Sequence, residues 1–299
     1  CVPVYTTGTS IDTGGQPRES LRTVYGRIDQ DIDRAIELLE KARETTLAEN
    51  NKSHINLYVA LGIKSRACLA EGDWDGAFKA AKRVIDEGGY AVGTKSDLTG
   101  GMNSLDKQNV MWGAGIQVAD QAGGYAGFFT HMDNKEGAYA KSAPKLISKQ
   151  LYNRISATDI RRDWWDPSDK ESPYVSKKFS FANVASFLGD YIYMRVEEMY
   201  FTAAEAALRL DDLKSARELM NTVMAERDPG YSANNRSGTL LGATTTTWTG
   251  SFLENILTHR RIELWGEYGR LFDVRRLGQG IDRRTDDGFS EECISMMNR

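Results

Sequence analysis

The chain has 299 residues, 40% of them hydrophobic, which is enough to bury a sizeable core as one large helical domain or two ordinary ones. Its 38 Lys and Arg against 42 Asp and Glu give a formal net charge of −4 with no basic block, which argues against a nucleic-acid partner. No apolar run approaches the roughly 20 residues that cross a bilayer, so the sequence predicts no membrane-spanning segment.

Helical periodicity predicts three helices in the first part of the chain. Apolar residues recur every three or four positions over residues 20–47, with Ser20 as the cap. A second helix is expected over residues 56–70. A third helix, capped by Asp73, should end at the glycine pair 88–89. The second and third helices should form an antiparallel hairpin.

This hairpin is echoed later in the chain. Matching residues recur at a constant offset: Ala67, Leu69, Asp73, Ala77 and Val84 line up with Ala206, Leu208, Asp212, Ala216 and Val223. Helix pairs with small residues where they cross, repeated along a chain, are typical of tetratricopeptide-like arrays. We therefore predict tetratricopeptide-like helices over residues 20–90 and 191–228.

Residues 92–190, between the two copies, differ in composition and in the spacing of their apolar residues. Gly, Ser, Asp and aromatic residues replace the helical periodicity, and alternation over residues 110–118 predicts one short strand. A helical scaffold with a long irregular excursion usually carries its binding surface there. The fold class we expect is mainly all-α, with a loop-rich excursion that contains short strands.

The stretch "HRRIELWGEYGRLFDVRRLG", residues 259–278, is dense in charge. On one continuous helix over residues 251–278, Glu263 and Glu267 would hold their carboxyl groups at about the ~5–6 Å spacing that a retaining glycosidase uses. Arg260 and Arg270 should keep both carboxylates ionised, however, and a general acid needs a raised pKa. We therefore favour a structural network over a catalytic dyad: Arg260, Arg261, Glu263, Glu267, Arg270, Asp273, Arg275 and Arg276.

The broad face beside this charged stripe should be apolar. Its expected members are Leu253, Leu257, Leu264, Trp265, Tyr268, Leu271 and Phe272. Such a face would pack the C-terminal motif against the rest of the helical core.

The same stretch resembles the C-terminal motif of the SusD/RagB family, ERRIEL-W/A-GE followed by R-W/F-D-L-RR. Other segments agree in order: "VPVYTT", "VYGRIDQDIDRAIELL", "LGIKSRACLAEGDWDGAFKAAKRVI", "TDIRRD" and "YIYMRVEEMYFTAAEAALRL". The resemblance covers about 250 of the 299 residues. It implies a single SusD-like helical domain over residues 1–299.

The resemblance also implies a function. Family members are cell-surface lipoproteins of Gram-negative bacteria that bind glycans and cap a SusC-like TonB-dependent transporter, facing outward from the outer membrane. They have no catalytic activity. The expected partners are therefore an oligosaccharide or polysaccharide and a SusC-like transporter, with nutrient uptake as the role.

Three features depart from the family pattern. His259 stands where Glu is usual, the chain begins far into the pattern, and it stops at "SMMNR" without a P-x-P-x-x-E ending. We expect the lipid anchor, the first helices and part of the glycan site to lie outside this chain. The alternative, that Cys1 is a lipid-bearing N-terminus, is disfavoured because it precedes an internal "VPVYT" segment.

A sugar site needs exposed aromatic platforms and paired hydrogen bonds, and the excursion supplies both. The glycan-binding candidates are Tyr125, Phe128, Phe129, Tyr139, Asn134, Trp164 and Trp165, with Gln121 and Asp133 close in sequence. Two alternatives stay open. Phe128 and Phe129 could form a buried plug, and we expect at most one of the two tryptophans to reach solvent.

Two rival functions stay open as well. A tetratricopeptide-type adaptor that binds peptides would show an uninterrupted run of helix pairs, which the excursion breaks. A glycoside hydrolase with a helical barrel would need two carboxylates with opposed pKa values, and Asp133 and Asp166 are its candidates. The histidines are scattered singly and no phosphate-binding glycine motif occurs, so we expect neither a metal nor a cofactor.

Overall fold

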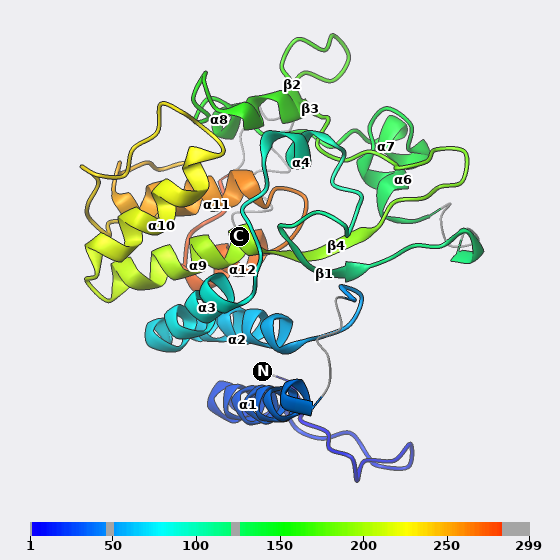
Figure 1. Ribbon diagram of the computed structural model, residues 1–299, viewed down its shortest axis with the longest axis vertical. Helices are drawn as coiled ribbons and strands as arrows, with labels where there is room; N and C mark the ends of the chain where they lie inside the picture. The colour runs from blue at the N-terminus through cyan, green and yellow to red at the C-terminus, as the bar shows by residue number, and fades with distance from the viewer. Residues whose placement is uncertain (1, 46–50, 121–125, 283–299) are drawn as a thin grey trace.

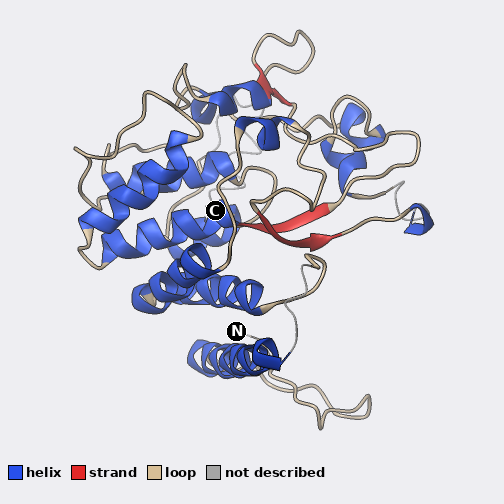
Figure 2. Ribbon diagram, viewed as in Figure 1, coloured by secondary structure: helices blue, strands red, loops and turns tan. Residues whose placement is uncertain are grey.

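The computed structural model describes residues 2–45, 51–120 and 126–282. Helices dominate the described chain, as predicted (Figures 1 and 2). The long ones are α1 (Leu21–Thr45), α2 (Leu57–Glu71), α3 (Trp74–Glu87), α9 (Val196–Arg209), α10 (Leu213–Ala225) and α11 (Phe252–Glu263). None of the helices in these ranges is long and apolar enough to span a membrane.

Side-chain caps set the starts of these helices. The Asn56 side chain accepts a hydrogen bond from the backbone N–H of Val59 at 2.9 Å, and Asp73 and Asp212 cap α3 and α10 in the same way. Ser20 caps α1 as expected. The caps predicted at Ser20 and Asp73 are confirmed, because capping depends only on neighbouring residues.

The two hairpins stack on each other. Helix α2 packs against α3, α3 against α9, and α9 against α10, while α1 covers α2 and α11 packs on α9 (Figure 1). The residues at these crossings are small and fully buried: Ala77, Ala81, Ala203, Ala206 and Ala207. Small side chains let the helix backbones approach closely, which confirms the tetratricopeptide-like arrangement.

The excursion forms short elements. They are α4 (Lys95–Thr99), β1 (Val110–Ala114), η1 (Val118–Asp120), α6 (Phe128–Met132), α7 (Ala138–Ser142), α8 (Lys149–Tyr152), η2 (Ile160–Trp164), β2 (Trp165–Asp166), β3 (Val175–Ser176) and β4 (Tyr191–Arg195). Strand β1 pairs antiparallel with β4, and β2 with β3. The predicted strand over residues 110–118 is thus shorter than expected. Register irregularities beside Trp112 break its alternation, so Val110 and Met111 are both buried.

The described residues form two large hydrophobic cores and a small cluster of Cys68, Leu69, Ala77 and Ala206. The first core lies among the long helices and includes Met111, Val196, Phe201, Leu219, Val223, Phe252 and Ile256. The second core belongs to the excursion: Leu98, Met102, Phe129, Ile147, Leu151, Tyr152, Ile155, Trp164, Trp165, Phe179, Phe181 and Ile262. Helix α11 contributes to both cores, and so connects the helical scaffold to the excursion.

The prediction of one helix over residues 251–278 is wrong. Helix α11 ends at Glu263, and a separate helix α12 (Arg270–Arg276) follows. Between them Gly266 and Gly269 have φ angles of +76° and +101°, which turn the chain out of the helical path. Leu271 and Phe272 are consequently 58% and 53% exposed instead of lying on an apolar face.

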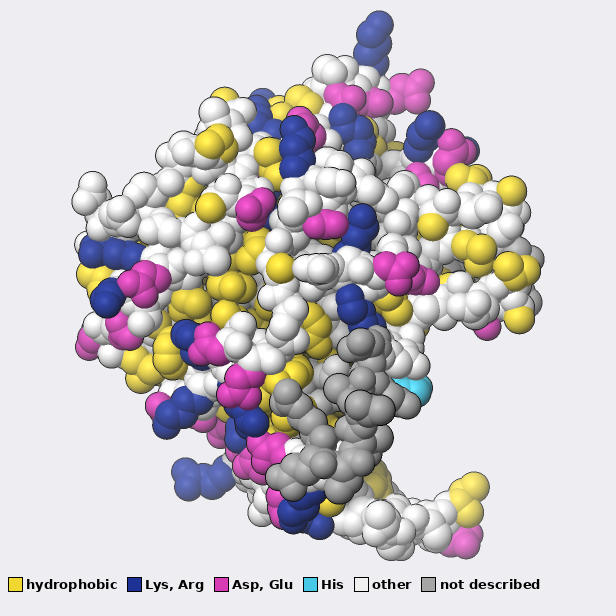
Figure 3. Space-filling view, in the orientation of Figure 1, with side chains coloured by type: hydrophobic (Ala, Val, Ile, Leu, Met, Phe, Trp, Pro, Cys, Tyr) yellow, Lys and Arg dark blue, Asp and Glu magenta, His cyan; other side chains and the backbone are white. Residues whose placement is uncertain are grey.

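The surface mixes charges of both signs. Figure 3 shows Lys and Arg interspersed with Asp and Glu over the face in view. Several of these charges form exposed pairs along α1 and α3, including Arg27 with Asp31 and Lys79 with Asp75. Such exposed pairs contribute little to stability, so the fold depends on buried contacts.

Candidate functional site

A cluster of buried charges lies beneath the C-terminal motif. We call it the ionic cluster: Asp159, Arg161, Lys178, Arg195, Glu197, Arg227, Glu263 and Glu267. The Glu263 carboxylate accepts hydrogen bonds from Arg161 at 3.1 Å, from Arg195 at 2.9 Å and from Arg227 at 2.9 Å. Glu267 accepts from Lys178 at 2.5 Å and from Arg195 at 2.8 Å.

These partners decide the protonation of both glutamates. Burial opposes the ionisation of Glu263, but the charges of Arg227, Arg195 and Arg161 outweigh it and hold the pKa of this carboxyl well below its usual value. Arg195 and Lys178 likewise outweigh burial and lower the pKa of Glu267. Neither group can act as a general acid near neutral pH, as the sequence-based argument expected.

A second set of ion pairs fixes α12 to the scaffold. Arg260 pairs with Asp273 at 3.2 Å and with Glu198 at 3.3 Å. Arg276 binds both carboxylate oxygens of Glu205 on α9, each at 2.7 Å. Arg260, Asp273 and Arg276 thus take part in buried ion pairs that join α12 to α11 and α9.

One member of the expected network lies outside it. Arg275 is exposed, and it has no ion-pair partner within the described part of the chain, because α12 turns this side chain to solvent. The prediction that Arg275 joins the network is therefore wrong. Arg261 and Arg270 line a pocket at the α11–α12 corner.

His259, the departure from the family pattern, is buried against the same network. Its Nδ1 lies 2.8 Å from a guanidinium nitrogen of Arg161. Burial, reinforced by the charge of Arg161, holds the pKa of His259 well below its usual value. The imidazole is therefore neutral, and its Nδ1 accepts a hydrogen bond from Arg161. His259 thus pairs with Arg161 as a neutral acceptor and adds no charge to the network.

An aromatic cleft opens beside strand β4. Two adjoining cavities, of about 210 and 360 Å³, share Ile192, Tyr193 and Glu267. We call them together the aromatic cleft. The remaining lining residues are Met102, Phe128, Phe179 and Tyr191 in one cavity, and Arg66, Trp112 and Tyr268 in the other.

The rings of the aromatic cleft are held from several sides. Trp112 and Tyr193 meet edge to face with ring centroids 5.1 Å apart. The Arg66 guanidinium lies 3.8 Å from the centre of the Tyr268 ring. Arg66 is itself fixed, because it donates to the Glu198 carboxylate and to the backbone carbonyl of Tyr193. Tyr193 remains 43% exposed, so the cleft offers a positioned aromatic surface.

The candidates from the sequence divide between surface and core. Phe128 is half-buried and lines the aromatic cleft, and its ring contacts Tyr191 and Phe179. The prediction that Phe129, Trp164 and Trp165 serve as exposed aromatic platforms is wrong. They are 1%, 3% and 1% exposed, because the excursion buries them in the second core.

Other candidates hold the loops together. The Asn134 amide donates to the backbone carbonyls of Ser176 and Lys145 and accepts from the Lys145 N–H, so both of its donors are used within the protein. Buried Asp133 accepts from three backbone N–H groups in the same way. Tyr139 is 39% exposed and stacks on His131, but it does not line the aromatic cleft. Tyr125 and Gln121 lie outside the described residues.

The sequence-based reasoning missed several residues of the cleft and the cluster. Tyr191 and Tyr193 alternate in "YIYMR", a signal for exposed rings on a strand. Arg195 follows Met194 and precedes Val196, and a charge inside an apolar run signals a buried pair. The contributions of Arg66 and Trp112 depend on contacts between distant segments, which spacing alone does not reveal.

The described residues contain no catalytic dyad with opposed pKa values. Asp133 is committed to backbone hydrogen bonds, and hydrogen bonds from Ser168 lower the pKa of half-buried Asp166. The same ranges contain no group of three or more His, Cys, Asp or Glu side chains arranged to hold a metal ion. The arrangement suits binding by aromatic contact more than acid–base chemistry.

The sequence model of the SusD family matches residues 129–292, more than half of the chain. The chain belongs to the SusD family. The match includes the α11–α12 corner, the whole ionic cluster and strand β4. A comparison with curated proteins finds no significant match.

Solved structures share the fold. A SusD-like carbohydrate binding protein from Bacteroides vulgatus superposes with a TM-score of 0.76 at 28% identity over 95% of this chain. A SusD superfamily protein from Bacteroides thetaiotaomicron superposes with a TM-score of 0.74 at 21% identity over 99% of this chain. Surface glycan-binding protein A from Bacteroides uniformis superposes with a TM-score of 0.63 at 17% identity over 92% of this chain. This chain covers 58%, 64% and 61% of those three structures, respectively. The mainly helical SusD-like fold is thus established.

Proposed function

We propose that this SusD family chain is a non-catalytic glycan-binding protein whose aromatic cleft holds an oligosaccharide or polysaccharide. The observation that carries the proposal is the set of rings around Tyr193, which are fixed by neighbours and still accessible. The pyranose ring of a sugar has apolar C–H faces that pack on aromatic rings. Its hydroxyl groups pair with charged side chains such as those of Arg66 and Glu267.

We further propose a place for this activity in the cell. The protein would act at the outward-facing surface of the outer membrane, held there by a lipid anchor, and would deliver its glycan to a SusC-like TonB-dependent transporter for nutrient uptake. The names of two structural relatives, a carbohydrate binding protein and a surface glycan-binding protein, support the glycan and the surface. The transporter partner follows from the family resemblance alone.

Affinity gel electrophoresis against plant, host and microbial polysaccharides tests the proposal. One polysaccharide should retard the chain, and Tyr193→Ala and Trp112→Ala should each weaken that binding by about tenfold, since truncating a central aromatic contact costs more than about 1 kcal/mol. Tyr139→Ala is the matched control, because it removes an exposed aromatic ring outside the aromatic cleft.

The control also separates the two possible locations. Loss of retardation in Tyr139→Ala, with Tyr193→Ala unaffected, would move the site to the glycine-rich loop and refute the assignment to the cleft. The same polysaccharides should yield no new reducing ends on incubation with the protein. Product formation that is lost in Asp166→Asn would instead support the hydrolase alternative.

A further inference from the structure

The aromatic cleft has two parts that differ in polarity. We call its cavity of about 210 Å³ the Phe cavity and its cavity of about 360 Å³ the Trp cavity. Residues that line one part alone include Met102, Phe128 and Phe179 for the Phe cavity, and Arg66, Trp112 and Tyr268 for the Trp cavity. The Phe cavity is smaller than the roughly 300–1,000 Å³ of most ligand pockets, so it suits one substituent of a sugar better than a whole glycan.

The apolar wall of the Phe cavity is firmly positioned. Phe128 and Phe179 meet edge to face with ring centroids 5.2 Å apart. Met102 has a φ of +51°, which non-glycine residues rarely adopt, and the Asn103 side chain after it donates to the backbone carbonyl of Ser180 at 3.0 Å. Backbone held in such a conformation is typical of ligand sites, where the surrounding structure fixes it.

Two polar groups of the Phe cavity are placed by hydrogen bonds within the protein. The Tyr191 hydroxyl oxygen accepts from the backbone N–H of Phe128 at 3.3 Å, which leaves the hydroxyl proton for a ligand. The Glu267 carboxylate accepts three hydrogen bonds from Lys178 and Arg195, and a carboxylate has about four acceptor sites. The Phe cavity can therefore donate one hydrogen bond to a ligand and accept one from it.

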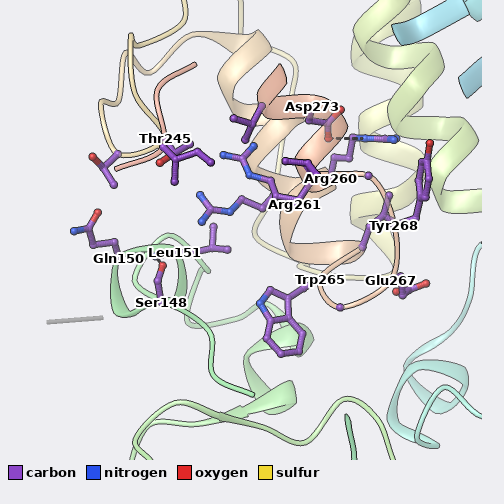
Figure 4. Close-up of a pocket in the computed structure, with 18 of the residues that line it drawn as sticks. Ser148, Gln150, Leu151, Thr245, Arg260, Arg261, Trp265, Glu267, Tyr268 and Asp273 are labelled. Atoms are coloured by element: carbon purple, nitrogen blue, oxygen red, sulfur yellow. Dashed lines mark hydrogen bonds and ion pairs between the residues drawn. The ribbon is translucent and has the colours of Figure 1, made fainter. Parts of the chain in front are cut away.

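Glu267 reaches the cleft from the α11–α12 corner. Figure 4 shows Glu267 and Tyr268 extending from this corner to the side away from Gln150 and Thr245, which line a pocket of about 580 Å³. Glu267 lines both cavities of the aromatic cleft, and so does Tyr193. A sugar ring that packs on Tyr193 in the Trp cavity can therefore extend one substituent into the Phe cavity beside Glu267.

The charges of the cleft favour an uncharged substituent. Arg66 binds both carboxylate oxygens of Glu198, at 2.9 and 2.6 Å, and Glu267 is ionised between Lys178 and Arg195. An acidic sugar would meet the Glu267 carboxylate, which repels it. A plain hydroxyl group would lose water against the apolar wall and gain no contact for it. The substituent that fits has both a hydrogen-bonding end and an apolar end.

We infer that the aromatic cleft binds glycans that contain an N-acetylated sugar, with the acetamido group in the Phe cavity. The N–H of this group would donate to Glu267, its carbonyl oxygen would accept from the Tyr191 hydroxyl, and its methyl group would pack on the ring of Phe128. The pyranose ring would lie against Tyr193. This inference rests on the proposed function and names the ligand class of the same site.

Isothermal titration calorimetry with matched methyl glycosides tests the inference. The glycosides of N-acetylglucosamine and N-acetylgalactosamine differ from those of glucose and galactose only in the group at C2. At least one N-acetyl sugar should bind about tenfold or more tightly than its parent, because it gains a buried methyl group and a hydrogen bond to a charged acceptor. The glycoside of D-fucose carries a methyl group at C5 in place of the hydroxymethyl group of galactose, and it should bind like the galactoside.

Variants separate the two cavities. Phe128→Ala should reduce the preference for the N-acetyl sugar over its parent by at least about threefold, because the methyl group loses its aromatic contact. Trp112→Ala should weaken the binding of both sugars by a similar factor of about tenfold and so keep the preference. Phe187→Ala is the matched control: it removes a 41% exposed ring that contacts Phe181 and does not line the cleft, so both affinities should stay unchanged.

Three results would overturn the inference. The first is that neither N-acetyl sugar binds the unaltered chain more tightly than its parent. The second is a preference in Phe128→Ala that equals that of Phe187→Ala. The third is a D-fucoside that binds as tightly as the N-acetylgalactosamine glycoside, since any methyl group would then suffice. If Phe128→Ala does not fold, as judged by circular dichroism, Phe128→Leu and the comparison of ligands still decide.

Failure of this inference is distinguishable from failure of the proposed function. Retardation by a polysaccharide without N-acetyl groups, lost in Tyr193→Ala, together with no preference for N-acetyl sugars, would overturn the ligand class and leave glycan binding in the cleft intact. Binding of the N-acetyl sugars that Tyr193→Ala and Phe128→Ala do not change would refute both.

Discussion

Glu263 shows how one side chain can organise segments that are far apart in sequence. Its carboxylate receives hydrogen bonds from Arg161, Arg195 and Arg227, and all four side chains are fully buried. Taking charges out of water is costly, and only close pairing with further hydrogen bonds offsets that cost. Removing one member leaves the others charged, buried and incompletely paired.

Replacing Glu263 by Gln should therefore destabilise the fold by about 3–5 kcal/mol at pH 7, as measured by urea unfolding. The effect should depend on pH. Because the arginines lower the pKa of Glu263 below its usual 4.5, its ionised form stabilises the fold above that pH, and the contribution is lost as pH falls toward the folded-state pKa. The difference in the free energy of unfolding between the unaltered chain and the variant should decrease below about pH 4.5.

Glu218→Gln provides the control for this prediction. Glu218 is 65% exposed on α10, and its loss should change stability by no more than about 0.5 kcal/mol at any pH tested. If Glu263→Gln lowers the free energy of unfolding by the same amount from pH 7 down to pH 3, the prediction is contradicted. That result would mean that the Glu263 carboxyl has the same pKa in the folded and unfolded states.

The sequence predicts the ionised state of Glu263 but not its partners. Local spacing points to Arg260 and Arg270, whereas the contacting arginines come from η2, β4 and the residues after α10. Pairing between segments 36 to 102 residues apart depends on the packed fold, which helical spacing does not encode. The same limit applies to Trp112 and Tyr193, which meet only when β1 pairs with β4.

At the scale of elements, local signals predict the helix hairpins and miss the α11–α12 corner. Caps and small-residue crossings act over a few residues, so Asp73 and Asp212 can be read directly from the sequence. At the corner, apolar spacing continues through Gly266 and Gly269, and a glycine inside a helix costs only about 1 kcal/mol. The chain turns at Gly266, where the backbone has a positive φ and neighbouring side chains leave no room for a Cβ.

Gly266→Ala tests this explanation. Its φ of +76° disfavours any other residue, and an added Cβ would lie 2.6 Å from the ring of Phe179 and 2.8 Å from the Met132 methyl carbon. Gly250 has the same φ of +76° with nothing within 4 Å, so Gly250→Ala reports the backbone cost alone, about 1–2 kcal/mol. Gly266→Ala should cost about 1–3 kcal/mol more in urea unfolding. Equal losses of unfolding free energy in Gly266→Ala and Gly250→Ala would show that the contacts with Phe179 and Met132 do not exclude a side chain at Gly266.

For the whole molecule, the notable feature is that two cores share one helix. Helix α11 places Ile256 in the first core and Ile262 in the second, and the ionic cluster surrounds its C-terminal end. The helical core was predictable because its residues repeat every three or four positions. The second core was not, since Phe129, Trp164 and Trp165 lie in segments without periodicity, where aromatic residues resemble exposed binding platforms.

This shared helix and the ionic cluster should make the two cores unfold together. Circular dichroism at 222 nm reports the long helices of the first core, and tryptophan fluorescence can be restricted to the second. A variant with Trp74, Trp112 and Trp248 each replaced by Phe keeps Trp164 and Trp165 in the second core and Trp265 packed against it. The two probes should give the same urea midpoint and the same slope in this variant, because coupled cores unfold in one transition.

The unaltered chain, followed by the same two probes, is the control for the three substitutions, and its circular dichroism midpoint should differ only by the cost of the replacements. A fluorescence midpoint at lower urea than the circular dichroism midpoint would contradict the prediction. It would mean that the excursion opens while the stacked hairpins persist, so that neither Ile262 nor Glu263 transmits the stability of α11 to the second core. Since the aromatic cleft is lined from both parts, by Arg66 of α2 and by Phe128 and Phe179 of the excursion, joint unfolding is also what keeps the cleft intact up to the midpoint.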